Sequence, residues 1–487
     1  MGEGIPWGTV ITVATTVGGY LLAFVLIPRI LLQQREAAAS LAWIMIIAFV
    51  PYLGALLFFL IGRRRIRRRT RKRLRARNVF DKATDQLPYQ DPDCPVVVPE
   101  PKLSGISKEI AKVASYVSEN KPLSGNQVEV YIETNRAYDR MEAAILEAQH
   151  HIHMMSYIFR SDQAGKRFRD LLADKARQGV EVRLLVDAVG SHQLETDFIR
   201  VLEEAGGHYA AFMPVFPLRG HWRPNLRNHR KILIADGRVG FAGGLNIGDE
   251  YQGRKKRFAP WRDTHMRVEG PAAWRLQEIF AEDWFYTTGQ DLVDPGHFPQ
   301  IQPVGDDVVQ VVESGPDQPH ENIHAVFFTA ISEAKNSIYI TTPYFVPDRA
   351  VLTALKAAAW KGVDVRILVP GKSDHGLIRL AGNSFHRELV QAGVKLYEHR
   401  PGMLHAKTMV VDGRWSTVGS ANMDIRSFRL NFEVNLLVSG ERFAASMEDI
   451  FMADIAKARV ITKEALDNKS GLVRFGEAVS RVLSPVL

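Results

Sequence analysis

The sequence predicts an α/β fold with two tandem, similar domains that share one site and follow a membrane anchor. Strand-like and helix-like segments alternate, and their order recurs in the second half, as in tandem α/β domains. A short polar motif also recurs, and two long apolar stretches precede both copies. We expect four parts: a two-helix transmembrane hairpin (1–62), a basic juxtamembrane segment and linker (63–125), domain 1 (126–300) and domain 2 (301–487).

Two uncharged stretches near the N-terminus are long enough to cross a membrane. Trp7 to Pro28 and Leu41 to Ile61 contain no Asp, Glu, Lys or Arg. About 20 apolar residues in a helix span a hydrocarbon core of about 30 Å. We therefore expect a hairpin of two transmembrane helices, at about 7–28 and 41–61. A cleaved signal peptide is the alternative for the first stretch, but Glu3 stands where a basic segment is expected.

Basic residues concentrate directly after the second stretch. Residues 63–77 contain 11 Lys or Arg and no acid, and the positive-inside rule places such a run in the cytoplasm. Residues 1–62 carry two Arg and two Glu, so the net charge of +8 leaves 8 − 11 − 0 = −3 for residues 78–487. This mildly acidic part argues against nucleic acid as a partner. Membrane topology explains the run, and contact with anionic membrane lipids would add about 1 kcal/mol per basic residue.

The predicted segments of the first half recur in the same order in the second half. The first half predicts strands at 127–132, 152–159 and 179–187, and helices at 139–150 and 171–178. The second half predicts strands at 308–312, 338–345 and 362–370, and a helix at 322–334. Before them, residues 78–104 are Pro-rich and indicate a linker, whereas Ile106, Ile110, Val113 and Val117 follow at helical spacing. With one copy of the polar motif each, the domains are expected to meet at a single interfacial site.

The recurring motif is His-x-Lys-x4-Asp, and an Asn follows each His at the same spacing. One copy comprises His229, Lys231, Asp236 and Asn246, and the other comprises His405, Lys407, Asp412 and Asn422. On an extended chain, every second residue projects from the same face, so each His shares a surface with its Lys. An imidazole nitrogen can attack phosphorus while an ammonium group holds the nonbridging oxygens. The motif therefore predicts phosphoryl or phosphatidyl transfer.

Two interpretations apply to the Asp of each copy. Asp236-Gly237 and Asp412-Gly413 are pairs that a tight turn after a strand requires. An orienting role toward the catalytic His is the rival interpretation. Both Asp residues therefore stand as candidate catalytic residues.

These motifs resemble those of the phospholipase D superfamily, whose members carry two such copies. The chain is more closely similar to the bacterial cardiolipin synthases, and this similarity covers essentially its whole length. It includes the two apolar stretches, Thr342 to Asp348, Lys372 to His375 and Pro401 to Lys407. The resemblance implies a multi-pass protein of the bacterial cytoplasmic (inner) membrane, with catalytic domains that face the cytoplasm.

The resemblance also implies a role for each candidate residue. One His attacks the phosphate and forms a phosphohistidine, while the other protonates the leaving glycerol; the sequence does not determine which His does which. The phosphate would be held by Lys231, Lys407, Asn246 and Asn422. A downstream acid would orient each His and fix its tautomer. The matching positions are Asp263 after His229 and Glu433 after His405, at unequal spacings.

The implied reaction joins two phosphatidylglycerol molecules into cardiolipin and glycerol. One phosphodiester is exchanged for another, so no nucleotide or other cofactor is expected, and the chain has no P-loop. The same residues would serve a phospholipase D or a phosphatidyltransferase with a different acceptor. A non-catalytic membrane lipid-binding scaffold is a remote alternative, because neither motif is broken. The oligomeric state, the acyl-chain preference, the route of product exit and the use of phosphatidylethanolamine do not follow from the sequence.

A metal site is not expected. Two Lys and two Asn supply the positive field that a cation would give, and the single cysteine, Cys94, excludes a Cys-based cluster. Zinc is an alternative suggested by His150, His151, His153 and His221. The alternation of Ile152 and Met154 with these histidines favours a strand instead.

Two further groups of residues have open interpretations. Arg219, Arg223 and Arg227 precede the first motif and could receive a second lipid phosphate or form an ordinary solvated loop. Tyr344 and Phe345 could line a channel for the lipid or belong to the core.

Overall fold

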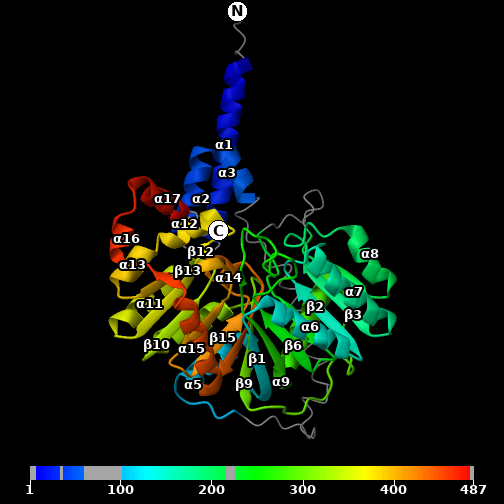
Figure 1. The fold of residues 1–487 in the computed structure, drawn as a ribbon. Helices are drawn as coiled ribbons and strands as arrows, with labels where there is room; N and C mark the ends of the chain where they lie inside the picture. Colours follow the sequence, from blue (N-terminus) through cyan, green and yellow to red (C-terminus); the bar gives the residue numbers. More distant parts are fainter. Residues whose placement is uncertain (1–6, 33–36, 60–100, 215–224, 483–487) are drawn as a thin grey trace, which may run out of the picture. The chain divides into compact units, whose positions relative to one another are not determined.

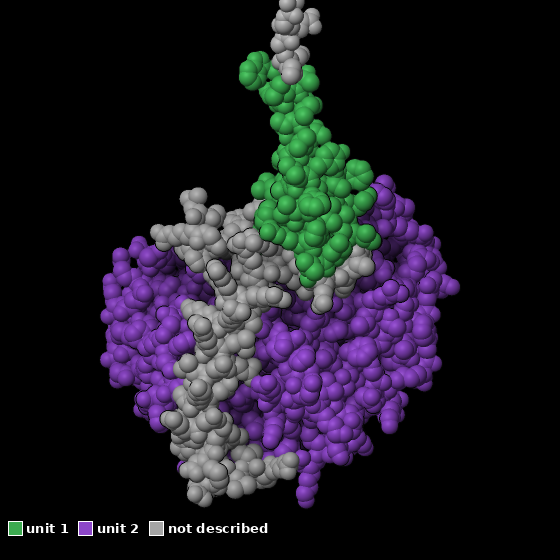
Figure 2. Space-filling view, turned by 180° about the vertical axis from the view of Figure 1, so that it is seen from behind, with its two compact units in different colours: residues 1–69, 217–225 green, residues 70–216, 226–487 purple. Residues whose placement is uncertain are grey.

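The computed structural model describes residues 7–32, 37–59, 101–214 and 225–482. The chain forms two compact units, residues 1–69 with 217–225 and residues 70–216 with 226–487, which Figure 2 colours separately. The basic run at 63–77 and most of the Pro-rich segment at 78–104 lie outside the described residues. Both copies of the polar motif belong to the second unit, so the candidate site lies within one unit.

The first unit contains one helix that is long and apolar enough to cross a membrane, counting described residues alone. This is α1 (Trp7–Leu31), with 25 residues. The second predicted span is divided into α2 (Ala37–Phe49) and α3 (Pro51–Leu57). Pro51 explains the division, because proline lacks the N–H that a continuous helix needs and suits the first turn of a new one. The predicted two-helix hairpin is therefore wrong, and a single N-terminal apolar helix suggests membrane anchoring.

The three helices of the first unit contact one another through a small apolar core. Leu26 and Ile30 of α1 and Ile47 of α2 are almost inaccessible to solvent. Tyr52 of α3 donates a hydrogen bond to the carbonyl oxygen of Thr15 at 2.7 Å. Most other apolar side chains of α1 are exposed, which agrees with lipid rather than protein as their surroundings.

The second unit is built on one continuous sheet in which the two halves of the chain repeat the same strand order (Figure 1). The first half contributes, in spatial order, β1 (Leu123–Tyr131), β8 (His265–Glu269), β6 (Val239–Gly243), β5 (Ile232–Ala235), β2 (His151–Ser156), β3 (Glu181–Asp187) and β4 (His208–Phe212). The second half contributes, in the matching order, β9 (Asp307–Ser314), β17 (Glu433–Ser439), β15 (Trp415–Gly419), β14 (Thr408–Val411), β10 (Ser337–Thr341), β12 (Asp364–Lys372) and β13 (Lys395–Leu404). Because β1 pairs with its equivalent β9 in antiparallel fashion, an approximate two-fold axis relates the halves.

Short strands complete the sheet at its second-half end. Strand β18 (Ala458–Val460) pairs with β13, and β11 (Phe345–Val346) pairs with β16 (Met423–Asp424) in a separate small sheet. Strand β7 (Trp261–Arg262) belongs to the first half in sequence, yet it pairs in parallel with β13 of the second half. This crossing pair brings the two halves together near the motif of the second copy.

Helices cover both faces of the sheet (Figure 1). One face carries α6 (Thr134–Glu147), α7 (Gln163–Arg177) and α8 (Thr196–Glu204) in the first half, and α10 (Asn322–Glu333), α11 (Arg349–Trp360) and α13 (His386–Gln391) in the second. The other face carries α9 (Pro271–Thr288) and α15 (Glu441–Ile455) over a core that both halves share. Further helices of this unit are α12 (Gly376–Asn383), α14 (Ile425–Arg429), α16 (Lys463–Asp467) and α17 (Gly471–Val482). The predicted α/β fold with two similar domains is confirmed.

Part of the expected linker is ordered and belongs to the second half of the fold. Helix α5 (Gly105–Ser118) contacts α10, and its Ile106, Ile110 and Ala114 are buried in the core of the second half. The helical spacing of the apolar residues predicted this helix. The structure differs from the expected linker at 63–125 because that apolar stripe is buried against the second half.

Candidate active site

The two motif histidines lie just before equivalent strands, His229 before β5 and His405 before β14. Each backbone N–H donates a hydrogen bond to the other half of the chain. His229 donates to the carbonyl oxygen of Phe432 at 2.9 Å, and His405 donates to that of Arg262 at 2.7 Å. These main-chain bonds bring both copies of the motif to the interface between the halves.

Each imidazole is paired with an acid from the opposite half. Nδ1 of His229 lies 3.0 Å from both carboxylate oxygens of Glu433, and Nδ1 of His405 lies 2.7 Å from Oδ2 of Asp263. The order along the chain suggested pairing within each copy, and the structure corrects this to a crossed pairing. The physical reason is local: each acid directly follows the residue whose carbonyl oxygen accepts the His N–H of the other half.

The acids fix the tautomer of both imidazoles. An ionised carboxylate only accepts hydrogen bonds, so Nδ1 carries the hydrogen and Nε2 keeps its lone pair. Burial lowers the pKa of His229 to about 4, against the attraction of Glu433 and with the help of Lys231. Burial and Lys407 also lower the pKa of His405. Near neutral pH, both rings are therefore uncharged in the free protein, which suits a nucleophile.

The two acids remain ionised although they are buried. Burial works to raise the pKa of Glu433, but His229 and Lys231 outweigh it and hold that pKa below its usual value. His405 and Lys407 likewise outweigh burial at Asp263 and lower its pKa. The arrangement thus keeps a fixed negative charge behind each reactive ring.

The two lysines are held beside the histidines that they follow. Nζ of Lys231 donates to the carbonyl oxygen of His229, and Nζ of Lys407 donates to that of His405, both at 2.5 Å. Nζ of Lys407 is also 2.9 Å from Nδ1 of His405. Since Nδ1 donates its hydrogen to Asp263, it does not accept one from Lys407, and the nearby ammonium lowers the pKa of the ring. Burial lowers the pKa of Lys231 to about 7 and that of Lys407 to about 8. An incoming phosphate would restore the charged form of both.

The two asparagines are buried in different hydrogen-bond environments. Oδ1 of Asn246 accepts the backbone N–H of Ile158 at 3.1 Å, and its Nδ2 lies 3.4 Å from the Tyr251 hydroxyl. Oδ1 of Asn422 is buried and has no hydrogen-bond partner among the described residues. Nearby Asp424 is also buried, and desolvation raises its pKa to about 6. The amide oxygen of Asn422 therefore lacks the kind of partner that the amide oxygen of Asn246 has.

Asp236 and Asp412 lie at the far ends of β5 and β14, away from the histidines that precede these strands. The Asp236 carboxylate accepts the backbone N–H groups of residues 149, 150 and 151 at 2.8–2.9 Å. The Asp412 carboxylate accepts those of residues 335, 336 and 337 at 2.7–3.2 Å. Both Asp residues have a φ of 53°. These bonds favour the turn interpretation and correct the placement of both Asp residues among the catalytic candidates.

Three residues whose role the sequence did not predict, Gly244, Ser420 and Asn431, make the surroundings of the two acids unequal. Ser420 donates a 2.5 Å hydrogen bond to Glu433, and Asn431 donates another at 3.1 Å. Gly244 stands at the equivalent of Ser420 in the first copy. A β-carbon there would overlap Oδ1 of Asp263, so glycine is what leaves room for this acid. The signal in the sequence is the shared offset, since Gly244 follows His229 at the spacing at which Ser420 follows His405.

Aromatic rings border both histidines. The Tyr157 ring lies 5.0 Å from that of His229, and the Trp261 and Tyr344 rings lie 5.3 and 6.3 Å from that of His405. The Tyr344 hydroxyl donates to the carboxylate of Asp374 at 2.7 Å. Tyr344 thus lies beside the site, as the channel interpretation requires, whereas Phe345 is buried in the core.

Of the three arginines that precede the first motif, the structure describes Arg227 alone. Arg227 is buried and pairs with Asp187 at 3.3 Å. This ion pair fits neither a solvated loop nor an open lipid-phosphate site. Arg219 and Arg223 lie outside the described residues.

A cluster of histidines forms at the opposite end of β2 from the motif histidines. Possible ligand atoms of His150, His151 and His297 lie within 4.8 Å of one another. Nδ1 atoms of His150 and His151 are 2.9 Å apart, and His297 contacts Glu181 at 2.8 Å. The sequence could not indicate this group, because His297 is far from the other two along the chain. His221 lies outside the described residues.

Comparisons with known proteins agree with this geometry. The family model described as "Cardiolipin synthase, PLD-like domain" matches residues 141–284 and 327–455, and one described as "Phospholipase_D-nuclease N-terminal" matches residues 21–63. A cardiolipin synthase of Geobacillus kaustophilus is 40% identical over 94% of this chain and 90% of that protein. One of Listeria innocua is 37% identical over 96% and 99%. The crystal structure of phosphatidylserine synthase from Haemophilus influenzae shares the fold, with a TM-score of 0.54, 14% identity, and coverage of 74% of this chain and 95% of that one.

Two α/β halves that contribute one His, one Lys and one crossed acid each define a phosphatidyltransferase built on the phospholipase D fold. The sequence identities of 40% and 37% to two cardiolipin synthases extend over nearly the whole chain and point to one family within this class. The chain belongs to the cardiolipin synthase family.

Proposed function

We propose that the chain transfers a phosphatidyl group from one phosphatidylglycerol to the hydroxyl of a second, which gives cardiolipin and glycerol. The observation that carries this proposal is the pair of buried imidazoles, each with Nδ1 on a carboxylate of the opposite half. That pairing leaves the lone pair of each Nε2 available to attack phosphorus or to accept a proton. The names of the relatives supply the lipid product.

In the first step, Nε2 of one His attacks the phosphorus of the donor lipid. An N–P bond forms, and the P–O bond to the terminal glycerol breaks. The second His, in its protonated form, gives its Nε2 proton to the departing glycerol oxygen. Free glycerol leaves, and the phosphatidyl group stays on the first His.

In the second step, a new phosphatidylglycerol takes the place of glycerol. The second His accepts the proton of the incoming hydroxyl through Nε2, and the hydroxyl oxygen attacks phosphorus. The N–P bond breaks and cardiolipin forms. Both imidazoles are then ready for another turnover, and no cofactor enters the balance.

The charges around the imidazoles support this order of reaction steps. In the free protein, burial lowers the pKa of both rings, so neither is strongly protonated. A phosphodiester brings a negative charge that favours a proton on the second ring and the charged form of both lysines. Lys231 and Lys407 lie beside the two histidines, where their charged forms would hold the phosphate oxygens. Asp236 and Asp412 take no step.

Membrane attachment supports lipid rather than water as the acceptor. Helix α1 is long enough to cross the bilayer, so the site works where lipid hydroxyls are concentrated. The basic run at 63–77 favours a cytoplasmic location for the catalytic domains under the positive-inside rule. A phospholipase D would use the same residues, with water in the second step.

The test is to incubate the purified full-length protein in mixed micelles with phosphatidylglycerol alone and to identify products by mass spectrometry. Cardiolipin with an equal amount of glycerol is expected. Phosphatidic acid with glycerol would identify water as the acceptor and contradict the proposal. His229→Ala and His405→Ala proteins serve as controls, and each is expected to form neither product.

A further inference from the structure

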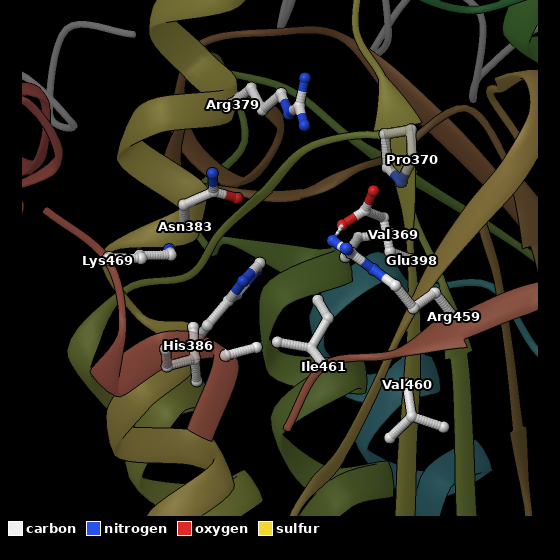
Figure 3. A pocket seen from close by; sticks show the side chains of 12 residues that line it. Val369, Pro370, Arg379, Asn383, His386, Glu398, Arg459, Val460, Ile461 and Lys469 are labelled. Carbon is white, nitrogen blue, oxygen red and sulfur yellow. Dashed lines mark hydrogen bonds and ion pairs between the residues drawn. The ribbon is translucent and has the colours of Figure 1, made fainter. Parts of the chain in front are cut away.

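A second, basic cavity lies in the second half of the fold, apart from the motif histidines. It has a volume of about 200 Å³, and Figure 3 shows the side chains around it. Its charged lining consists of Arg379 of α12, Arg459 of β18, Lys469 and Glu398. Three cations and one anion line the cavity, and Glu477 next to the lining pairs with Lys469, so the surplus is 3 − 2 = +1. A surplus of this kind in a confined space favours an anionic ligand.

The cations of the cavity are not all neutralised by protein. Arg459 pairs with Glu398 at 2.7 Å, and Lys469 pairs with Glu477 at 2.6 Å. Arg379 has no ion-pair partner among the described residues. His386 also lines the cavity, and burial together with Lys469 and Arg379 lowers its pKa to about 3. An uncharged ring can donate one hydrogen bond to a phosphate oxygen without adding to the repulsion.

The helices beside the cavity carry their apolar side chains outward. In α17, Glu477 and Ser480 are buried, whereas Leu472, Phe475 and Val482 are 85%, 70% and 78% exposed. This is the reverse of a helix that packs on a protein core. Outward apolar side chains together with basic residues on the same helix are typical of helices that lie in a membrane interface.

The neighbouring helix α12 continues this apolar surface. It contacts α17, buries the small Ala381 and Gly382, and exposes Leu377 and Leu380. The patch therefore comprises Leu377, Leu380, Leu472, Phe475, Val479 and Val482. Exposed basic residues interrupt it at Arg379, Arg474 and Arg481. A soluble partner would not explain this combination as directly as the surface of an anionic bilayer does.

We propose that this cavity, with the apolar patch beside it, binds the headgroup of an anionic phospholipid that remains in the bilayer. The lipid phosphate would lie at Arg379 and Lys469, which connect the cavity to α12 and α17. The apolar side chains of the patch would enter the acyl region of the same leaflet. The site is distinct from the catalytic one, because none of its lining residues belongs to the His, Lys and acid pairs.

The chain connects this docking surface directly to the catalytic site. Strand β12 passes the cavity at Val369 and Pro370. Shortly after it, Asp374 accepts the hydroxyl hydrogen bond of Tyr344, whose ring borders His405. Helix α12 then begins at Gly376. A bilayer held at α12 would therefore lie close along the chain to Asp374, whose partner Tyr344 borders His405.

The experiment measures the depth of α17 in a bilayer with the full-length protein. Cys94→Ser removes the natural cysteine, and Phe475→Cys provides a site for an environment-sensitive fluorophore. The matched control is Tyr116→Cys on α5, which is 79% exposed and lies at the opposite end of the unit (Figure 1). Vesicles of phosphatidylcholine, with or without phosphatidylglycerol, carry a lipid-attached quencher.

We expect strong quenching at position 475, a further increase with phosphatidylglycerol, and no quenching at position 116. Arg379→Gln should remove most of the increase, whereas Arg136→Gln on α6 should leave it unchanged. Equal quenching at 475 and 116 would overturn the proposal. An increase reproduced by inorganic phosphate alone would identify a free-phosphate site, and a label shielded by a second copy would identify a dimer surface; either would overturn it.

The same measurement in a His405→Ala background separates this inference from the proposed reaction. No lipid is consumed there, so quenching reports docking alone. Quenching without cardiolipin synthesis by the intact enzyme would contradict the proposed function and leave the docking site standing. Cardiolipin synthesis without quenching at position 475 would contradict the docking site and leave the proposed function standing.

Discussion

The first and second copies of the motif share a backbone but not the environment of their side chains. Both histidines donate their N–H across the halves, and both place Nδ1 on an acid of the opposite copy. The acid of His229 is Glu433, which Ser420 and Asn431 hold by hydrogen bonds. The acid of His405 is the shorter Asp263, which fits because Gly244 has no side chain.

This difference teaches that symmetry of the fold does not impose symmetry of the chemistry. The main-chain bonds set the positions of both imidazoles, whereas side chains set the charge and the hydrogen bonding behind each. Two reacting groups with different tasks, a nucleophile and an acid–base, need different environments. The contrast at positions 244 and 420 is the clearest structural source of such a difference.

Among the residues behind the two histidines, the largest effects are expected from removing the charge of the crossed acids. Glu433→Gln and Asp263→Asn should each lower kcat by about 10²–10⁴-fold, because an amide no longer holds the Nδ1–H tautomer or the charged ring. Product formation from phosphatidylglycerol measures the loss. NMR titration of the labelled rings then tests the crossing: Glu433→Gln should change the pKa of His229 and leave that of His405. The reverse result would contradict the crossed pairing.

Exchanging the residues behind the acids should give smaller and unequal effects. Gly244→Ala places a β-carbon against the Asp263 carboxylate, so kcat should fall toward that of Asp263→Asn. Ser420→Ala removes one hydrogen bond to a charged group, worth about 1.5–3 kcal/mol, so kcat should fall by about 10–150-fold. Ser420→Gly is the matched control, since it copies the first half. Equal losses for Gly244→Ala and Ser420→Ala would refute the asymmetry.

The pH dependence of substrate binding should follow the two lysines. Burial lowers their pKa values to about 7 and about 8 in the free protein. The positive charges are present below these values and are lost as the pH rises through them, so KM should begin to rise near pH 7 and rise more steeply above about pH 8, by up to tenfold per pH unit for each lost proton. Lys231→Arg should flatten part of this rise, because guanidinium stays charged. A KM that is constant with pH would contradict the assignment of phosphate binding to the two lysines.

The smallest effect on chemistry is expected from the turn residues of the motif. Asp236→Asn and Asp412→Asn weaken hydrogen bonds to three backbone N–H groups each. The free energy of unfolding should fall by about 1–3 kcal/mol, while kcat at a permissive temperature stays within about twofold. Thermal unfolding and product formation measure the two quantities. A collapse of kcat at unchanged stability would restore the orienting role.

The sequence predicted the parts of the site that lie close together along the chain. The repeat, the paired His and Lys and the alternation of strands and helices are local patterns, and the fold agrees with them. The pairing of Glu433 with His229 is different, because it depends on a main-chain bond from His229 to Phe432, in the other half of the chain. Spacing within each copy favoured the wrong partner.

The membrane segment and the histidine cluster are two further features that local sequence patterns did not predict. Counting uncharged residues gave a second span at about 41–61, but Pro51 within it begins a new helix. His297 joins His150 and His151 only after the chain has passed through all the elements from α7 to α9. Only the folded structure brings such distant residues into contact, so their spacing in the sequence does not predict the contact.

The most direct test of the account is to capture the covalent intermediate on one motif histidine. Full-length protein is quenched with acid-free denaturant during turnover of phosphatidylglycerol, and peptide mass spectrometry locates the phosphatidyl group. We expect the adduct at His229 or His405, on one of them only, with complete loss when that His is replaced by Ala. An adduct on another residue, or steady cardiolipin synthesis by both single His→Ala proteins, would contradict it.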